Sequence, residues 1–176
     1  NIQNNTNNDI ENQTSENNLN KDNGIMLLSS PAPLSVQYRT HVQNIGWQNY
    51  VQNGNTAGTS GQSLRLEAIN IKLLNTENNL SIKYQVHIQN IGWQSWKENG
   101  EMAGTSGQSL RLEAIRLSLD SSDKYSIMYR VHVQNIGWQD WKTDGEMAGT
   151  SGQSLRLEAI QIKIIPKQKK AKIYID

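Results

Sequence analysis

Hydrophobic and polar residues alternate over much of this chain, and the alternation predicts β-strands rather than helices. Between residues 82 and 88, for example, the apolar residues Ile, Tyr, Val and Ile are separated by single polar residues. A period of two places the apolar side chains on one face of a half-buried strand. A second alternating stretch, residues 110–119, changes its phase between Ala114 and Ile115. That change predicts a β-bulge, or a strand that passes between two layers.

The pattern occurs in three units of about 45 residues, at 36–73, 82–119 and 127–164. Each unit predicts four strands, which are a long first strand, a tight hairpin of two strands and a long, bent fourth strand. The hairpin turn is predicted by a dipeptide in which both residues adopt positive φ. These dipeptides are Asn53-Gly54, Asn99-Gly100 and Asp144-Gly145.

One such unit is too small to bury its own apolar face, so we expect the three units to close one core. The sequence therefore predicts an all-β fold, a single domain with pseudo-threefold symmetry at residues 34–165. A β-trefoil, in which the first and fourth strands form a barrel capped by the hairpins, is favoured by the short hairpin and the longer flanking strands. A β-prism of three four-stranded sheets is the alternative.

The two ends of the chain lie outside the repeats. Residues 1–33 are predicted to form a low-complexity, Asn-rich arm and a Pro-containing linker, because the arm is too polar to offset its ordering entropy by burial. The basic tail, 166–176, has a predicted short strand at 173–175. A run of apolar residues in the arm is predicted to be a strap on the domain or a strand given to a neighbouring copy. This candidate assembly segment is Ile25, Met26, Leu27 and Leu28.

Composition excludes several classes of function. The chain has 176 residues, a formal net charge of +1 and no cysteine. Disulfides, thiolate metal sites and cysteine nucleophiles are therefore excluded, and no global field attracts the chain to nucleic acid or to a membrane. Its sequence has no nucleophile motif, no phosphate-binding loop before a helix and no metal-ligand cluster. We expect no enzymatic activity, no cofactor, no bound metal, no nucleic-acid partner and no membrane insertion.

Each unit carries one histidine and one Arg-x-Glu segment at equivalent positions. The histidines (His41, His87 and His132) point away from the apolar strand face, which favours a structural role. The alternative is a zinc site on the threefold axis, since zinc accepts three imidazoles. Arg111 and Glu113 lie two residues apart on one strand face, as do their equivalents. This spacing predicts ion pairs rather than the paired carboxylates of glycoside hydrolysis.

The second strand of each unit is the best candidate for ligand binding. Its tryptophan, next to a glycine, is predicted to lie in the core (Trp47, Trp93 and Trp138). Alternation then places an amide and an aromatic ring on the outward face. A ring stacks on the C–H groups of a sugar while an amide bonds its hydroxyls. With the polar turn residue of each unit, the candidate ligand-binding residues are Gln48, Tyr50, Asn53, Gln94, Trp96, Asn99, Gln139, Trp141 and Asp144. The ring packing on its own hairpin, or contacting a protein, is the alternative.

The segment HVQNIGWQxW, followed by DGEMAGTSGQSLRLEAI, resembles the ChW repeat, the clostridial hydrophobic repeat with a conserved tryptophan. The resemblance covers residues 36–164. It implies a secreted or cell-surface protein of a Gram-positive bacterium, in which the repeats bind or adhere and do not catalyse. It supplies no set of ligand residues.

Two functional hypotheses follow from these observations. The leading one is a non-catalytic extracellular binding and adhesion module, multivalent for a glycan or a cell-wall polysaccharide, because linked weak sites raise avidity. The alternative is a self-assembling subunit of a surface fibre or layer, whose partners are other copies of itself. In that hypothesis the segment 25–28 completes a sheet edge of the next copy, and head-to-tail contacts build a filament.

Overall fold

The computed structural model describes residues 32–76 and 79–167, and every regular element in these ranges is a β-strand. No helix among the described residues is long and apolar enough to cross a membrane. The candidate assembly segment 25–28 and the predicted strand at 173–175 lie outside the described residues.

Each repeat contains five strands, with a long strand at each end and three short ones between them. The first repeat contains β1 (Ser35–Val42), β2 (Gly46–Trp47), β3 (Val51–Gln52), β4 (Ala57–Gly58) and β5 (Leu66–Leu74). The second contains β6 (Ser81–Ile88), β7 (Gly92–Trp93), β8 (Lys97–Glu98), β9 (Met102–Gly104) and β10 (Leu112–Asp120). The third contains β11 (Tyr125–Val133), β12 (Gly137–Trp138), β13 (Lys142–Thr143), β14 (Ala148–Gly149) and β15 (Leu157–Pro166).

The prediction of four strands in each repeat is wrong, because the predicted second strand is divided into two. In the second repeat these are β7 and β8, separated by residues 94–96. The division occurs where the Gln94 side chain turns to bind the backbone of Gly104, in the strand that follows the turn. The Gln94 amide still donates to the Val86 carbonyl of β6 over 3.0 Å, and regular pairing with β6 resumes only at Lys97.

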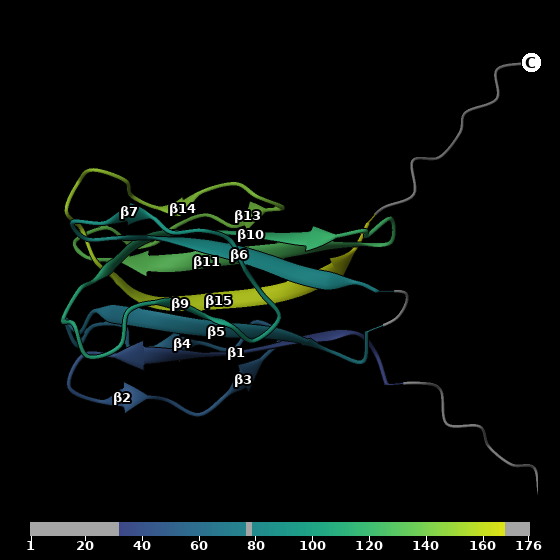
Figure 1. Ribbon diagram of the computed structural model, residues 1–176, viewed down its shortest axis with the longest axis horizontal. Coiled ribbons are helices and arrows are strands. Elements are labelled where there is room, and N and C mark those ends of the chain that lie inside the picture. Colours follow the sequence, from purple (N-terminus) through teal and green to yellow (C-terminus); the bar gives the residue numbers. More distant parts are fainter. Residues whose placement is uncertain (1–31, 77–78, 168–176) are drawn as a thin grey trace, which may run out of the picture. The chain divides into compact units, whose positions relative to one another are not determined.

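The strands form three antiparallel sheets, and each sheet combines two repeats (Figure 1). Within a repeat the two long strands pair along their length, as β1 with β5, β6 with β10 and β11 with β15. Two short strands of the same repeat line the outer edge of the first long strand. The third short strand crosses to another repeat, so that β9 pairs with β5, β14 with β10 and β4 with β15. The predicted all-β fold of three repeats is confirmed, and the crossing strands close the repeats into a cycle.

The predicted turn forms, but the predicted hairpin around it does not. Asn99 and Gly100 have φ values of 28° and 91°, and the Glu101 amide donates to the Glu98 carbonyl over 2.9 Å. The strands that flank this turn belong to different sheets, since β8 pairs with β6 and β9 pairs with β5. The turn therefore carries the chain from its own sheet to that of the preceding repeat.

A glycine marks the place where each crossing strand meets its neighbour's sheet. Gly104 has a φ of 102°, and a Cβ atom there would lie 2.3 Å from the Glu67 carbonyl oxygen and 2.7 Å from the Ala68 Cα. No side chain fits at such a distance. The equivalent residues Gly58 and Gly149 are just as close to the strands that they meet. Glycine is therefore required for the contact between repeats.

One hydrophobic core runs through all three repeats, and a buried tyrosine of each repeat binds the backbone around the crossing. The Tyr84 hydroxyl donates to the Glu101 carbonyl and accepts the Ile71 amide of the first repeat over 3.3 Å. Tyr38 is equivalent and accepts the Ile162 amide over 3.0 Å. Burial raises the pKa of Tyr38, Tyr84 and Tyr129 to about 12.

We expect the fold to lose stability between pH 10 and pH 12. The folded-state pKa of the three buried tyrosines, about 12, is above their ordinary value of 10.0, so the unfolded chain releases these protons first. Their stabilisation is complete below pH 10 and is lost as the pH rises to 12. Urea unfolding followed by circular dichroism, repeated from pH 8 to pH 12, measures this loss.

The Tyr84→Phe variant is the control for this prediction. It loses hydrogen bonds worth about 1 kcal/mol at neutral pH, and its stability then falls less steeply above pH 10 because one titrating group is gone. An unchanged slope in this variant would contradict the assignment.

Candidate functional site

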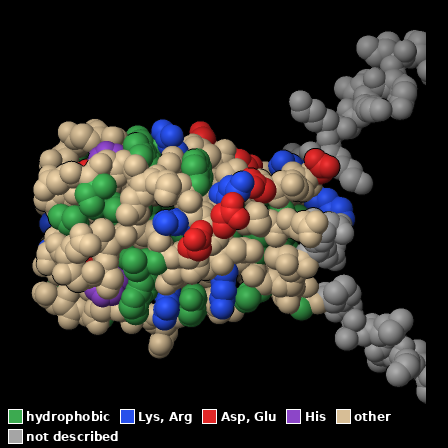
Figure 2. All heavy atoms as spheres, viewed as in Figure 1, with side chains coloured by type: hydrophobic (Ala, Val, Ile, Leu, Met, Phe, Trp, Pro, Cys, Tyr) green, Lys and Arg blue, Asp and Glu red, His purple; other side chains and the backbone are tan. Residues whose placement is uncertain are grey.

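An aromatic ring stands on the outer face of each repeat, in the segment between its two short edge strands. Tyr50 and Trp96 are 36% and 45% exposed, and Trp141 is half-buried. Figure 2 shows hydrophobic side chains beside Lys and Arg side chains on one face of the molecule. These three candidate residues lie on the outer face as predicted, although the segment that carries them is not the continuous alternating strand that the sequence predicts.

The prediction that the repeated tryptophan lies in the core is wrong. Trp47, Trp93 and Trp138 are half-buried, because their two-residue strands lie at the edges of the sheets. In the first repeat the Arg39 guanidinium lies 4.7 Å from the centre of the Trp47 ring, and the His41 ring meets it edge-on at 5.5 Å. Arg39, two residues before the histidine, is a site residue that was not predicted from the sequence.

In the first and third repeats one arginine contacts two rings, that of the repeated tryptophan and the outward ring of the same repeat. The Arg39 guanidinium lies 4.7 Å from the Tyr50 ring as well as from that of Trp47, and Lys72 lies 5.0 Å from Tyr50. In the third repeat Arg130 lies 5.0 Å from Trp138 and 4.9 Å from Trp141, and Lys163 lies 4.2 Å from Trp141. These cation–π contacts hold the rings in place and cover part of their surface.

The second repeat lacks this arrangement. Gln85 replaces the arginine of the first long strand, and Ser118 replaces the lysine. Arg116, on the last long strand, lies 4.6 Å from the Trp93 ring. Among the described residues, no Lys or Arg lies over the ring of Trp96. The three repeats are therefore not equivalent at their outer face.

The polar members of the predicted platform are bonded within the chain. The Gln94 side chain accepts the Gly104 amide over 2.8 Å and donates to the Gly104 carbonyl over 3.4 Å. Gln48 and Gln139 bind Gly58 and Gly149 in the same way. The turn residues Asn53, Asn99 and Asp144 accept backbone amides with their side-chain oxygens. These six residues hold the crossing strands and the turns, and the rings are the exposed part of the platform.

A buried glutamate lies at the bulge of each last long strand. In β10 the pairing register skips Glu113, which confirms the bulge that the change of phase predicts. One Glu113 oxygen lies 2.8 Å from the Arg111 guanidinium and the other lies 3.0 Å from His87 Nδ1. Glu67 and Glu158 have the same partners in their repeats, so the predicted Arg–Glu ion pairs are confirmed. Within residues 32–76 and 79–167, no group of three His, Asp or Glu side chains is placed to hold a metal ion.

An open groove of about 450 Å³ lies beside Trp96. Positively and negatively charged side chains line it, together with the Trp96 ring and the turn of the third repeat. The lining residues are Lys83, Trp96, Glu98, Arg116, Ser118, Asp120 and Gly145. The Lys83 ammonium bonds Asp120 and lies 3.5 Å from Glu98. The hydrogen bond from Lys83 to Asp120 raises the pKa of that ammonium.

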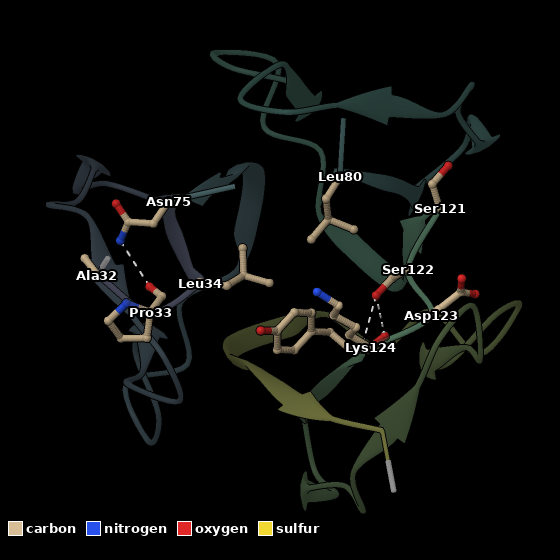
Figure 3. Close-up of a pocket in the computed structure, with 10 residues that line it drawn as sticks. Ala32, Pro33, Leu34, Asn75, Leu80, Ser121, Ser122, Asp123 and Lys124 are labelled. Carbon is tan, nitrogen blue, oxygen red and sulfur yellow. Dashed lines mark hydrogen bonds between the residues drawn. The ribbon is translucent and has the colours of Figure 1, made fainter. Parts of the chain in front are cut away.

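A second cavity, of about 380 Å³, lies where the first long strands begin. Figure 3 shows Leu34 and Leu80 pointing into it from two different repeats, with Ser122 and Lys124 at its side. Ala32 and Pro33 also line it, and the Asn75 side chain donates to the Pro33 carbonyl over 3.1 Å. The first described residues of the chain thus lie at this cavity.

The comparison with protein families gave one match, in three tandem copies. The model of the family described as "Clostridial hydrophobic W" (ChW) matches residues 41–75, 87–121 and 132–166. These ranges cover more than half of the chain and fall one on each structural repeat. The comparisons with curated proteins and with solved structures gave no match.

We expect Glu113→Gln to destabilise the fold by roughly 3 kcal/mol, because it leaves a partly buried guanidinium without its counter-ion. Glu98→Gln is the matched control, since Glu98 forms an ion pair with Lys83 at the surface. Its loss is expected to cost less than about 1 kcal/mol. Urea unfolding of both variants measures the difference, and equally small effects would show that the buried ion pair does not support the bulge.

Proposed function

We propose that this chain, which belongs to the clostridial hydrophobic W (ChW) family, is a non-catalytic binding and adhesion module of a bacterial cell surface. Its ligand is a glycan or a cell-wall polysaccharide, bound through the outward rings of Tyr50, Trp96 and Trp141. The observation that supports this proposal is an outward aromatic ring at the same position of each repeat, exposed in two repeats and half-buried in the third. A ring of this kind can stack on the C–H face of a pyranose.

The surroundings of the rings favour binding over a purely structural role. Each ring projects from a segment anchored on both sides by edge strands, and the guanidinium of Arg39 or Arg130 fixes two of the three rings from one side. Little side-chain entropy remains to be lost when a ligand stacks on such a ring. Several weak contacts of this kind on one chain raise its avidity for a repetitive polymer.

The carboxylates of the described residues support a role without catalysis. Acid–base chemistry on a glycosidic bond needs two carboxyl groups with room for substrate between them. The buried glutamates Glu67, Glu113 and Glu158 instead have both oxygens engaged by an arginine and a histidine of the same repeat. They are built to hold the bulge.

Titration calorimetry with cell-wall polysaccharide of a Gram-positive bacterium tests the proposal. The triple variant Tyr50→Ala, Trp96→Ala, Trp141→Ala is expected to bind at least tenfold more weakly, which corresponds to 1.4 kcal/mol. The control is the triple alanine variant of three exposed apolar residues without rings, which are Ile45, Ile91 and Ile136. Absence of binding by the unchanged protein across wall fragments and a broad glycan array would overturn the proposed function.

The cavity lined by Ala32, Pro33 and Leu34 favours a second candidate function, assembly with other copies. The apolar segment 25–28 precedes this cavity by only a few residues, so the same segment of a second copy can be its occupant. Addition of a strand to a sheet edge has less support. Along β5, for example, short strand β9 and the turn before it already cover the outer edge from Ala68 to Leu73.

Sedimentation of the full chain at high concentration, compared with a chain lacking residues 1–30, tests this second function. We expect the full chain to form oligomers that the shortened chain and a Leu27→Asp, Leu28→Asp variant do not form. If all three remain monomeric, assembly through the arm is wrong.

A further inference from the structure

The geometry points to one specialised ligand site, the groove beside Trp96 in the second repeat, and we propose that it binds a pyranoside that carries a carboxylate. This inference rests on the proposed function and deepens it. It follows from a difference between the repeats. A residue that differs in one repeat, while the residues around it are the same in all three, is not required for the packing of the repeats against one another.

The difference is an exchange of two side chains across one pair of strands. In the first repeat Arg39 lies opposite Asn70 and donates to its oxygen over 3.3 Å. In the third repeat Arg130 lies opposite Gln161 and donates to its oxygen over 2.8 Å. In the second repeat the same two positions hold Gln85 and Arg116, in the reverse order.

The exchange leaves the guanidinium of Arg116 without the acceptor that its counterparts have. The Gln85 side chain donates to the Gln94 carbonyl over 3.1 Å instead of pairing with the arginine. Arg116 Nε is buried and has no hydrogen-bond partner, and no carboxylate of the described residues lies within ion-pair distance of the guanidinium. A buried donor without a partner costs free energy that a ligand acceptor can recover.

A second substitution uncovers the neighbouring ring. Lys72 and Lys163 lie over the outer ring in the first and third repeats, and the shorter Ser118 occupies this position in the second. Trp96 is consequently the most exposed of the three rings, and the groove opens along it. The turn of the third repeat closes one side of the groove, since the Gly145 amide donates to the Leu117 carbonyl over 2.6 Å.

The lining of the groove selects the chemistry of the ligand. The ring of Trp96 offers an apolar face for the C–H groups of a pyranose. Lys83 is already neutralised by Asp120 and Glu98, so Arg116 is the cation left for the ligand. A guanidinium binds a carboxylate through two parallel hydrogen bonds. The oxygens of Ser118, Glu98 and Asp120 then remain to bond sugar hydroxyls.

The test uses the full chain and oligogalacturonate as the probe, with the methyl-esterified oligomer as its neutral counterpart. We expect the acid to bind, and the ester to bind at least fivefold more weakly. Trp96→Ala is expected to weaken binding of the acid at least tenfold, whereas Trp141→Ala in the third repeat changes it less than twofold. Calorimetry gives the affinities, and thermal unfolding shows that each variant is folded.

A double variant isolates the exchange itself. Gln85→Arg with Arg116→Gln gives the second repeat the arginine–glutamine pair of the third, so the fold is retained while the unpaired guanidinium is removed. We expect this variant to bind the acid at least tenfold more weakly and to unfold at the same or a higher temperature. The reverse change, Arg130→Gln, Gln161→Arg and Lys163→Ser, is expected to create a second site and double the binding stoichiometry.

Several outcomes overturn the inference while leaving the proposed function in place. These are equal binding of acid and ester, loss of binding with Trp141→Ala but not with Trp96→Ala, unchanged binding in the double variant, and binding of wall polysaccharide without binding of the acid. If neither the acid, the ester nor any wall polysaccharide binds, the proposed function itself is wrong.

Discussion

The short strand that each repeat places on the sheet of another repeat is the contact on which the other features of the structure depend. Strand β9 reaches β5 only because Gly104 lets two backbones approach where no Cβ fits. The Gln94 side chain then binds both polar backbone groups of that glycine, and the Tyr84 hydroxyl bonds the backbone on both sides of the crossing. These contacts satisfy the polar backbone groups of Gly104 within the chain. The glycine, the glutamine and the tyrosine that the repeats share are therefore explained by closure of the cycle.

The local structure could be predicted from the sequence. Which sheet the strand after each turn would join could not be predicted. A period of two, a change of phase and an Asn-Gly or Asp-Gly pair each report on a few neighbouring residues, and the strands, bulges and turns follow from them. Whether the chain forms a hairpin after the turn or crosses to another sheet depends on a distant segment. In the second repeat this segment is the backbone of Glu67 and Ala68, against which Gly104 packs. The repeated tryptophan is predicted to lie in the core because it recurs beside a glycine. Its two-residue strand pairs only with the end of the neighbouring long strand, at the edge of the sheet, and this leaves the ring half-buried.

The candidate site shows the same division. The sequence predicts the outward position of Tyr50, Trp96 and Trp141. The alternation behind that prediction does not hold, because the predicted strand is interrupted between β7 and β8 and its tryptophan is only half-buried. The sequence could not show that Gln85 faces Arg116, because the register between two long strands joined by more than twenty residues comes from the fold. Once the register is known, the residues that are identical in the three repeats account for how the domain closes. The exchanged pair, Gln85 and Arg116, shows where the second repeat differs from the others. The departure from symmetry marks the specialised site, and the repeated rings mark the surface that all three repeats present.

The cyclic closure also sets the order in which the chain can be completed during synthesis. Strand β4 of the first repeat pairs with β15 of the third, about a hundred residues later in the chain. Strand β4 therefore stays unpaired until nearly the whole domain has left the ribosome. Contacts with such long sequence separation form slowly. A nascent chain that ends after two repeats has unpaired strand edges at both ends, and each edge is complementary to the missing part of another chain. The same geometry that makes three repeats self-sufficient makes two repeats prone to pair with other copies.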